Sequence, residues 1–243
     1  MKIFLFVIIS LLFWLSPTTN IGRSVNNNLK DKCNKTVDIS EKDVLDIYAK
    51  CNLNDELDYT VFNQAMIGYN SFSLTNKKVI TIIDFSKPST EKRLFIIDLE
   101  NRKLLFQTFV AHGKNSGLIK PTKFSNRIGS NQSSLGFYRT AETYTGRHGY
   151  SLMLDGLEKN INDNARKRAI VIHGAKYVSD EFIKKNNRLG RSWGCPAVSD
   201  ELSEEIIDLI KDGSCLYIYA NNVDYAEHYI GTNLNDPPVP NMD

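Results

Sequence analysis

Histidine and cysteine are scarce in this sequence, and those present are scattered. The 243 residues include 4 of each, and the histidines at positions 112, 148, 173 and 228 are too far apart to form a metal site by spacing. There is no glycine-rich phosphate loop, no internal repeat and no sustained basic run, and the net charge is only +2. These absences argue against a metalloenzyme, a nucleotide-binding enzyme, a repeat protein and a nucleic-acid-binding protein. We therefore expect no metal, no organic cofactor and no nucleic-acid partner.

An apolar run of the length typical of a transmembrane helix is also missing. Lys2 precedes a run at 3–15 that is apolar except for Ser10, and Ser16 and Pro17 end it. This layout is typical of a secretory signal, and it is shorter than the ~20 residues that a membrane-spanning helix needs. The sequence thus predicts a signal peptide at 1–19 and an exported protein of the periplasm or cell envelope. Because the cleavage pattern is poor, an uncleaved N-terminus that tethers the chain to the membrane stays an alternative.

Export would place the four cysteines in an oxidising compartment, where their pairing must be considered. Cys33 and Cys51 share the N-terminal segment and are the natural structural pair, although the sequence does not decide whether they are bonded. Cys215 lies in the run CLYIY and is expected to be a buried strand residue. Cys195 must stay free if it is to act as a nucleophile.

Periodicity divides the chain into a helical segment and a strand-rich domain. Apolar residues repeat at helical spacing in 40–51, where Ser40 is the expected N-cap, and again in 58–70. Apolar runs rich in β-forming residues predict the strands, and the second and third of these strands should form a hairpin. The predicted strands are 79–85, 94–99, 104–111, 169–172 and 215–220, with loops over 120–150 and helices at 179–187 and from Ser199 to Gly213. The fold class is therefore mainly β (α+β), with an N-terminal helical segment.

The run RSWGCPA at 191–197 carries the residues with the clearest chemistry. Cys195 stands between Gly194 and a proline, neither of which favours a helix interior or a central strand, so the cysteine should lie on a sharp turn. A thiol attacks a carbonyl as the thiolate, whose formation a histidine, nearby arginines or a helix N-terminus promotes. His173 ends an apolar strand and is the expected base, Arg191 is close in sequence, and a helix should begin just beyond. The sequence predicts a low pKa for Cys195; the alternative is a buried structural cysteine.

The residues around this histidine and cysteine resemble a known family. HGAKYVS at 173–179 followed by GRSWGCPAV at 190–198 resembles the signature of L,D-transpeptidase catalytic domains, the cysteine enzymes that cross-link bacterial peptidoglycan, in their divergent murein L,D-transpeptidase branch. Commoner members carry a second histidine at the position of Trp193. The resemblance implies a β-sandwich or barrel-like catalytic domain. Its expected bounds are 76–230, with a linker and N-terminal helices at 20–75 and a flexible tail at 231–243.

The resemblance also implies a reaction and a site. In this family the cysteine attacks a peptidoglycan stem peptide, the terminal D-alanine leaves, and an amine or water resolves the acyl-enzyme. The backbone amides of Gly194 and Cys195 are the expected oxyanion donors, because glycine lets the substrate approach closely. His112, like His148, is a weaker candidate for lining the cleft. The predicted catalytic residues are Cys195, His173 and Gly194, and the predicted substrate-binding residues are Arg191, Ser192, Trp193, His148, Arg147 and Gly174. We expect a monomer whose partners are peptidoglycan stem peptides.

Other interpretations stay open at this point. An exported cysteine peptidase or amidase would use the same pair on other peptides, and a non-catalytic cell-wall-binding module would keep the fold without the reaction. The sequence also does not distinguish a transpeptidase from an L,D-carboxypeptidase. In the segment 120–150 the single acidic residue, Glu142, is outnumbered by five basic residues: Lys120, Lys123, Arg127, Arg139 and Arg147. They predict either a solvated surface or a cleft wall that holds substrate carboxylates.

Overall fold

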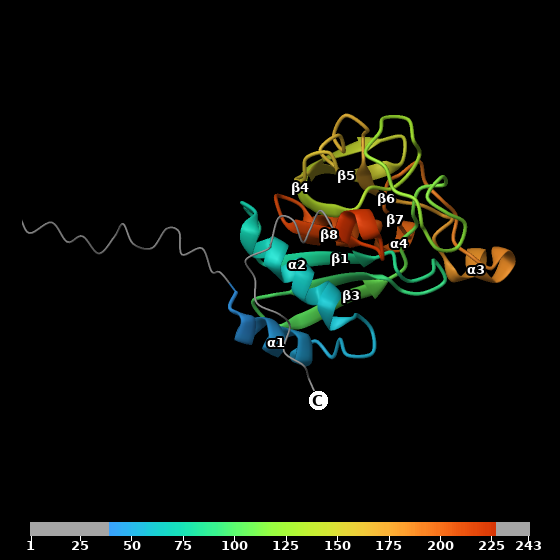
Figure 1. Cartoon of the computed structure of the whole chain (residues 1–243). Coiled ribbons are helices and arrows are strands. Elements are labelled where there is room, and N and C mark those ends of the chain that lie inside the picture. Colours follow the sequence, from blue (N-terminus) through green and yellow to red (C-terminus); the bar gives the residue numbers. More distant parts are fainter. Residues whose placement is uncertain (1–38, 227–243) are drawn as a thin grey trace, which may run out of the picture. The chain divides into compact units, whose positions relative to one another are not determined.

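The structure, a computed structural model, describes residues 39–226 (Figure 1). The predicted signal peptide, the linker up to residue 38, Cys33 and the tail at 231–243 lie outside the described residues. Within the described range no helix combines the length and apolar character needed to cross a bilayer. The first described elements are the helices α1 (Glu41–Lys50) and α2 (Tyr59–Ser71), which confirm both predicted N-terminal helices to within a residue or two.

Both helices begin at a side-chain cap: Ser40, as predicted, for α1 and Asp58 for α2. Ser40 Oγ accepts a hydrogen bond from the Asp43 amide at 3.2 Å, and Asp58 Oδ1 accepts one from the Thr60 amide at 2.7 Å. The apolar faces of α1 and α2 belong to the same hydrophobic core as the strands. Cys51, directly after α1, is a buried thiol that forms no disulfide with the other cysteines of the described residues. The helical segment is thus packed on the sheet.

Strands make up most of the remaining structure. They are β1 (Val79–Asp84), β2 (Leu94–Asp98), β3 (Lys103–Thr108), β4 (Gly136–Gly146), β5 (Gly149–Gly156), β6 (Val171–Gly174), β7 (Ala197–Val198) and β8 (Cys215–Tyr219), with helices α3 (Asp180–Asn186) and α4 (Asp200–Ile210) between them. The strands form one sheet in the order β3-β2-β1-β8-β4-β5-β6-β7. β2 and β3 pair antiparallel, which confirms the predicted hairpin, and β1 pairs parallel with β8. A mainly β, barrel-like sheet with N-terminal helices is what the sequence predicted.

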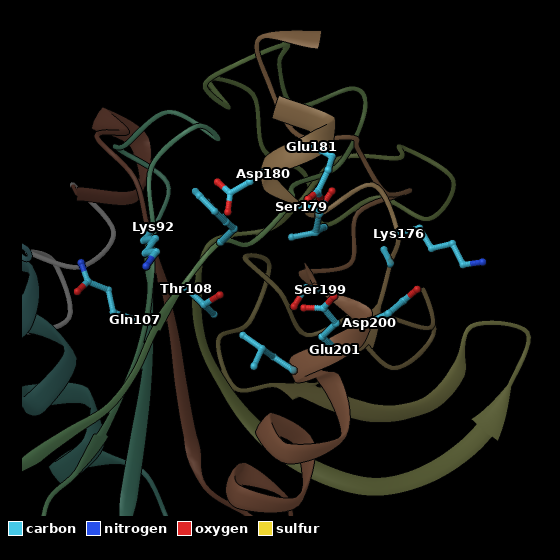
Figure 2. Close-up of a pocket in the computed structure, with 14 residues that line it drawn as sticks. Lys92, Gln107, Thr108, Lys176, Ser179, Asp180, Glu181, Ser199, Asp200 and Glu201 are labelled. Carbon is cyan, nitrogen blue, oxygen red and sulfur yellow. The ribbon is translucent and has the colours of Figure 1, made fainter. Parts of the chain in front are cut away.

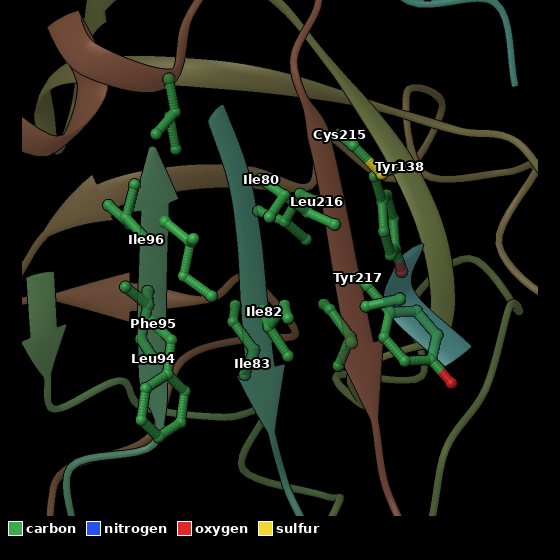
Figure 3. Packing of buried hydrophobic residues seen from close by; sticks show 14 of the residues in the cluster. Ile80, Ile82, Ile83, Leu94, Phe95, Ile96, Tyr138, Cys215, Leu216 and Tyr217 are labelled. Atoms are coloured by element: carbon green, nitrogen blue, oxygen red, sulfur yellow. The ribbon is translucent and has the colours of Figure 1, made fainter. Parts of the chain in front are cut away.

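The centre of the sheet is buried on both faces and consists mainly of apolar side chains (Figure 3). All six residues of β1 are buried, and β2 and β8 are buried except at their last residue. Fully burying one such Ile, Leu or Phe stabilises the fold by about 1.5–3 kcal/mol. Cys215 is completely buried in β8, as predicted, and the ring of Phe137 stacks on Tyr217 with 4.2 Å between the ring centres. This rigid centre carries the strands that reach the site.

The prediction of loops throughout 120–150 was wrong for its second half. β4 and β5 form an antiparallel hairpin in register Gly146 with Gly149, and Arg147 and His148 form its tip. Gly149 has φ of +74°, which suits glycine in a tight turn. The outer half of β4 is exposed on both faces, so it lacks the alternating apolar pattern that identifies a strand. The same hairpin places two predicted site residues at its end.

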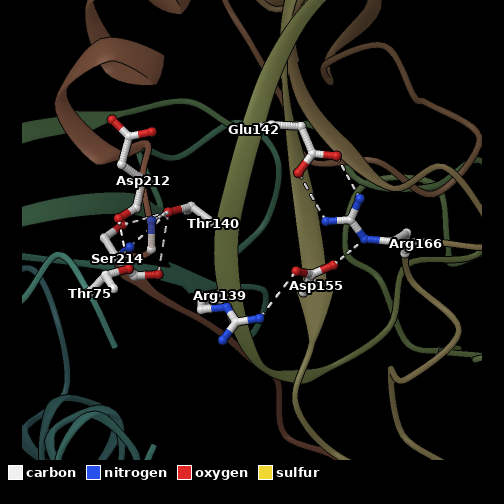
Figure 4. A network of polar contacts seen from close by, with 9 residues as sticks. Thr75, Arg139, Thr140, Glu142, Asp155, Arg166, Asp212 and Ser214 are labelled. Carbon is white, nitrogen blue, oxygen red and sulfur yellow. Dashed lines mark hydrogen bonds and ion pairs between the residues drawn. The ribbon is translucent and has the colours of Figure 1, made fainter. Parts of the chain in front are cut away.

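Polar contacts tie this hairpin to its surroundings (Figure 4). Thr140 Oγ1 donates to the carbonyl of Ile210 at 2.6 Å and accepts from the Ser214 amide at 2.8 Å, which joins β4 to the turn between α4 and β8. Arg139 pairs with Asp155 at 3.5 Å and is exposed. The other four basic residues of 120–150 are exposed as well, which favours a solvated surface over a cleft wall.

Candidate active site

The predicted sharp turn is present at Cys195. Gly194 has φ of +126°, a conformation that other residues rarely adopt, and a Cβ on it would lie 2.7 Å from the carbonyl oxygen of Gln132. Ser192 Oγ accepts from the Gly194 amide at 3.0 Å and donates to the Cys195 carbonyl at 2.6 Å. Ser192 is buried, so the side chain braces the turn from inside. Of the two predicted oxyanion donors, the Gly194 amide therefore already has a partner.

The Cys195 thiol lies against the start of β6. It is the least buried of the three described cysteines, and its Sγ donates to the carbonyl of Ala169 at 3.6 Å. Burial raises the pKa of the Cys195 thiol, while the Val171 amide and the charge of Arg168 oppose that rise. The direction of this shift is opposite to the low pKa predicted from the sequence, because desolvation outweighs these two stabilising groups.

His173 lies on β6, as predicted, and is 2% exposed. Its Nδ1 lies 2.7 Å from the Gly174 carbonyl oxygen, a contact that requires the proton on Nδ1 and leaves Nε2 as an acceptor. Burial lowers the pKa of His173, and the adjacent His148 lowers it further, so the imidazole is neutral near pH 7. The register of β6 and β7 pairs His173 with Ala197, two residues after Cys195. Among the described residues no hydrogen bond joins the Cys195 and His173 side chains.

The hairpin tip brings a second histidine to the site. The His148 ring stacks on His173 with 4.4 Å between the ring centres and 26° between the planes. His148 and its neighbour Arg147 are both exposed. The structure therefore places His148 over the predicted base, where it covers one face of the imidazole.

The remaining predicted binding residues differ in what they contact. Trp193 is 68% exposed, and Lys114 Nζ lies 5.4 Å from the centre of its ring. The guanidinium of Arg191 instead donates to the carbonyls of Lys114 and Gly117 at 3.0 and 3.1 Å. Arg191 thus ties two backbone segments together, and Trp193 is the side chain beside Cys195 that is presented to solvent.

The structure contradicts the interpretation of His112 as a cleft residue. His112 is fully buried, and its Nδ1 accepts from Arg93 Nη2 at 2.9 Å while its Nε2 lies 3.3 Å from the Gly117 carbonyl oxygen. Burial and the Arg93 charge lower its pKa to about 3. His112 is thus a neutral, internal hydrogen-bond partner of the Arg93 guanidinium and of the Gly117 carbonyl.

Sequence reasoning missed two residues near the thiol. Arg168 and Tyr177 both interact electrostatically with Cys195, and burial raises the pKa of Tyr177 to about 12. The Tyr177 ring packs over Gly190, where an added Cβ would come within 2.4 Å of it. Tyr177 belongs to the HGAKYVS run, so its position was a usable signal. Nothing in the local sequence distinguishes Arg168 from other basic turn residues.

A pocket of about 500 Å³ lies beside the site, between β3 and the first turns of α3 and α4 (Figure 2). Its wall is predominantly polar and includes Asp180, Glu181, Asp200 and Glu201. Gly174 borders this region, since a Cβ there would lie 2.7 Å from Asp200 Oδ1. Neither Cys195 nor His173 lines the pocket. In residues 39–226 no three His, Cys, Asp or Glu side chains are arranged to hold a metal ion.

Comparison with known proteins identifies the family. A sequence model of the L,D-transpeptidase catalytic domain matches residues 53–219. This chain belongs to that family. Both His173 and Cys195 lie within the matched residues, so the family's domain contains the turn and the strand described above. A comparison with curated proteins gave no significant match.

Several solved structures, L,D-transpeptidases among them, are similar to this one at low sequence identity. They include an L,D-transpeptidase from Mycobacterium smegmatis (11% identity, TM-score 0.37, covering 59% of each chain). Others are the helical cell shape determining protein Pgp2 from Campylobacter jejuni (15%, 0.38, covering 59% of this chain and 48% of that one) and an L,D-transpeptidase from Stackebrandtia nassauensis (12%, 0.36, 74% and 77%). The chain thus spans 59% of the length of the mycobacterial protein. Membership of the family rests on the sequence match.

Proposed function

We propose that this protein is an exported cysteine acyltransferase that acts on peptidoglycan stem peptides. Membership of the L,D-transpeptidase catalytic domain family supports an enzyme of this general kind. One structural observation carries the assignment of residues: a partly exposed thiol on a glycine turn lies beside β6, which carries a neutral histidine. Cys195 is the nucleophile in this proposal, and His173 is the base.

The reaction begins with a change in the direction of the thiol. In the resting structure its proton is donated to the Ala169 carbonyl, so the thiol must turn toward Nε2 of His173. Nε2 accepts the proton, and Sγ attacks the carbonyl carbon of the L-centred third residue of the stem. The bond to D-alanine breaks, and its nitrogen takes the proton from Nε2. Catalytic hydrogen bonds often tighten only in the substrate complex, which is consistent with the resting geometry.

The oxyanion that forms during this attack needs a donor. The Cys195 amide has no partner in the described part of the chain, whereas the Gly194 amide donates to Ser192. We assign the Cys195 amide as the oxyanion donor from this turn. Loss of one such donor typically lowers kcat by about 10²- to 10³-fold. Through its hydrogen bonds to the Gly194 amide and the Cys195 carbonyl, Ser192 then holds the backbone of the turn in place rather than binding substrate.

The acyl-enzyme is resolved in a second step. An amine of a neighbouring stem, or water, attacks the thioester carbonyl and gives its proton to His173, and Sγ leaves. The amine yields a crosslink, and water yields a tripeptide, the L,D-carboxypeptidase product. Trp193 is presented to solvent beside Cys195 and is proposed to contact the stem, as are His148 and Arg147 from the hairpin tip.

A defined substrate tests the proposal. The purified protein is incubated with tetrapeptide muropeptides, and the products and the intact protein are analysed by mass spectrometry. We expect loss of D-alanine, a crosslinked or tripeptide product, and a transient acyl adduct on Cys195. Cys195→Ala should form neither adduct nor product, while Cys215→Ala, which alters a thiol buried in β8, should retain both. An active Cys195→Ala variant would refute the assigned nucleophile, and cleavage of unrelated peptides alone would favour a general cysteine peptidase.

A further inference from the structure

Arg168 is a partly buried cation held entirely by uncharged oxygen atoms. Its Nη1 donates to the Ser125 carbonyl at 2.6 Å and to Ser134 Oγ at 2.8 Å. Its Nη2 donates to the Gln132 carbonyl and to Ser130 Oγ. Among residues 39–226 no carboxylate lies within ion-pair distance of this guanidinium. A buried cation without a counter-charge is costly, because burial removes the water that stabilises it.

Arg166, two residues earlier on the same turn, provides the contrast (Figure 4). Its guanidinium is exposed and pairs with both Glu142 and Asp155. The chain thus neutralises one arginine of this turn with two carboxylates and surrounds the other only with neutral acceptors. The difference leaves the charge of Arg168 without a carboxylate partner among residues 39–226, so it is available to a neighbouring group that becomes negative during function.

The cysteine turn is the neighbour that meets this requirement. A Cβ placed on Gly194 would lie 3.2 Å from Arg168 Nη2, so the guanidinium lies directly behind the turn. The thiol of Cys195 donates to the carbonyl of Ala169, the residue after Arg168. Ala169 has φ of +53°, an unusual value for a residue with a side chain, and such conformations persist where the surrounding structure imposes them. The Arg168 charge lowers the pKa of Cys195 against the effect of burial.

We propose that Arg168 is a positioning residue of the acyl transfer, whose charge stabilises the Cys195 thiolate once His173 has taken the proton. The inference rests on the proposed role of Cys195 as nucleophile. The four hydrogen bonds to the loop 125–134 hold the guanidinium behind the turn, and the absence of a carboxylate leaves its charge available to the thiolate. Arg191, which the sequence suggested for this role, is directed at backbone carbonyls instead.

The acidity of the thiol tests this inference without any substrate. The rate of Cys195 carboxamidomethylation by iodoacetamide is measured against pH, with the modified residue identified by peptide mass mapping. An opposite charge nearby typically lowers a pKa by about 1–3 units, so Arg168→Gln should raise the midpoint by about 1 unit. Arg168→Lys keeps the charge and should stay near the wild-type midpoint. The matched control Arg166→Gln should leave it unchanged.

Each outcome decides the question. A wild-type midpoint in folded Arg168→Gln overturns the inference, as does an equal rise in Arg168→Gln and Arg168→Lys, which would trace the effect to lost hydrogen bonds. If Arg168→Gln does not fold, Arg168→Met takes its place: a midpoint about 1 unit above that of Arg168→Lys supports the inference, and equal midpoints in the two variants overturn it. The proposed function fails by a different measurement, the muropeptide products of Cys195→Ala, so the two failures are distinguishable.

Discussion

Replacing Glu158 by glutamine should make the free energy of unfolding depend less on pH. The Glu158 carboxylate accepts from the Phe137 amide at 2.5 Å and from the Tyr225 hydroxyl at 3.2 Å, and burial raises its pKa to about 7 from an ordinary value of 4.5. At about 1.36 kcal/mol per pKa unit, this difference between the folded and ordinary pKa values corresponds to about 3 kcal/mol in the free energy of unfolding. Glutamine has the same shape, and its amide oxygen can still accept from Phe137.

The sign follows from proton binding. The folded protein holds the Glu158 proton more tightly than the unfolded chain, so the associated stability is fully present below about pH 4.5 and is lost as pH rises to about 7. We expect Glu158→Gln to gain about 3 kcal/mol over the wild type between pH 4 and pH 8, since glutamine does not ionise. Urea unfolding at both pH values, followed by circular dichroism, measures the difference.

A control of opposite sign sharpens this test. Glu142 is exposed, and hydrogen bonds from Arg166 lower its pKa to about 2. Glu142→Gln should therefore destabilise the protein slightly at neutral pH, with an effect that fades as pH falls. If the gain from Glu158→Gln is equal at pH 4 and pH 8, burial does not control the ionisation of Glu158, and the reasoning is refuted.

Three further predictions concern the site. His173→Ala should lower kcat by about 10²- to 10⁴-fold and His148→Ala by less, because only His173 is proposed to accept the proton. The kinetics of both variants on one tetrapeptide measure this, and a larger loss in His148→Ala would make His148 the base. Wild-type Cys195 should alkylate with a midpoint above the free-thiol value of about 8.5, because burial raises its pKa, and a midpoint below it in the pH titration would contradict this. Gly190→Ala should cost about 1–3 kcal/mol in urea unfolding, because the new Cβ would overlap the Tyr177 ring; unchanged stability would show that the ring moves freely.

The sequence determined the elements whose signals are local. Helices α1 and α2 follow from their caps and apolar spacing, and β1, β2 and β8 follow from continuous apolar runs that can only be buried. The glycine and proline around Cys195 required a turn, and the apolar run before His173 predicted the strand that carries it. These features depend on residues close in sequence, where backbone preference and burial act together.

The tertiary structure alone decided how distant residues meet. The outer part of the β4–β5 hairpin is exposed, so no apolar pattern announces it, yet its pairing places His148 on the ring of His173. Arg168 lies behind Cys195 because the loop 125–134 folds over it, and the charge of Arg191 is turned to backbone carbonyls. The acidity of Cys195 is likewise a tertiary property, because desolvation depends on what the whole fold packs around the thiol.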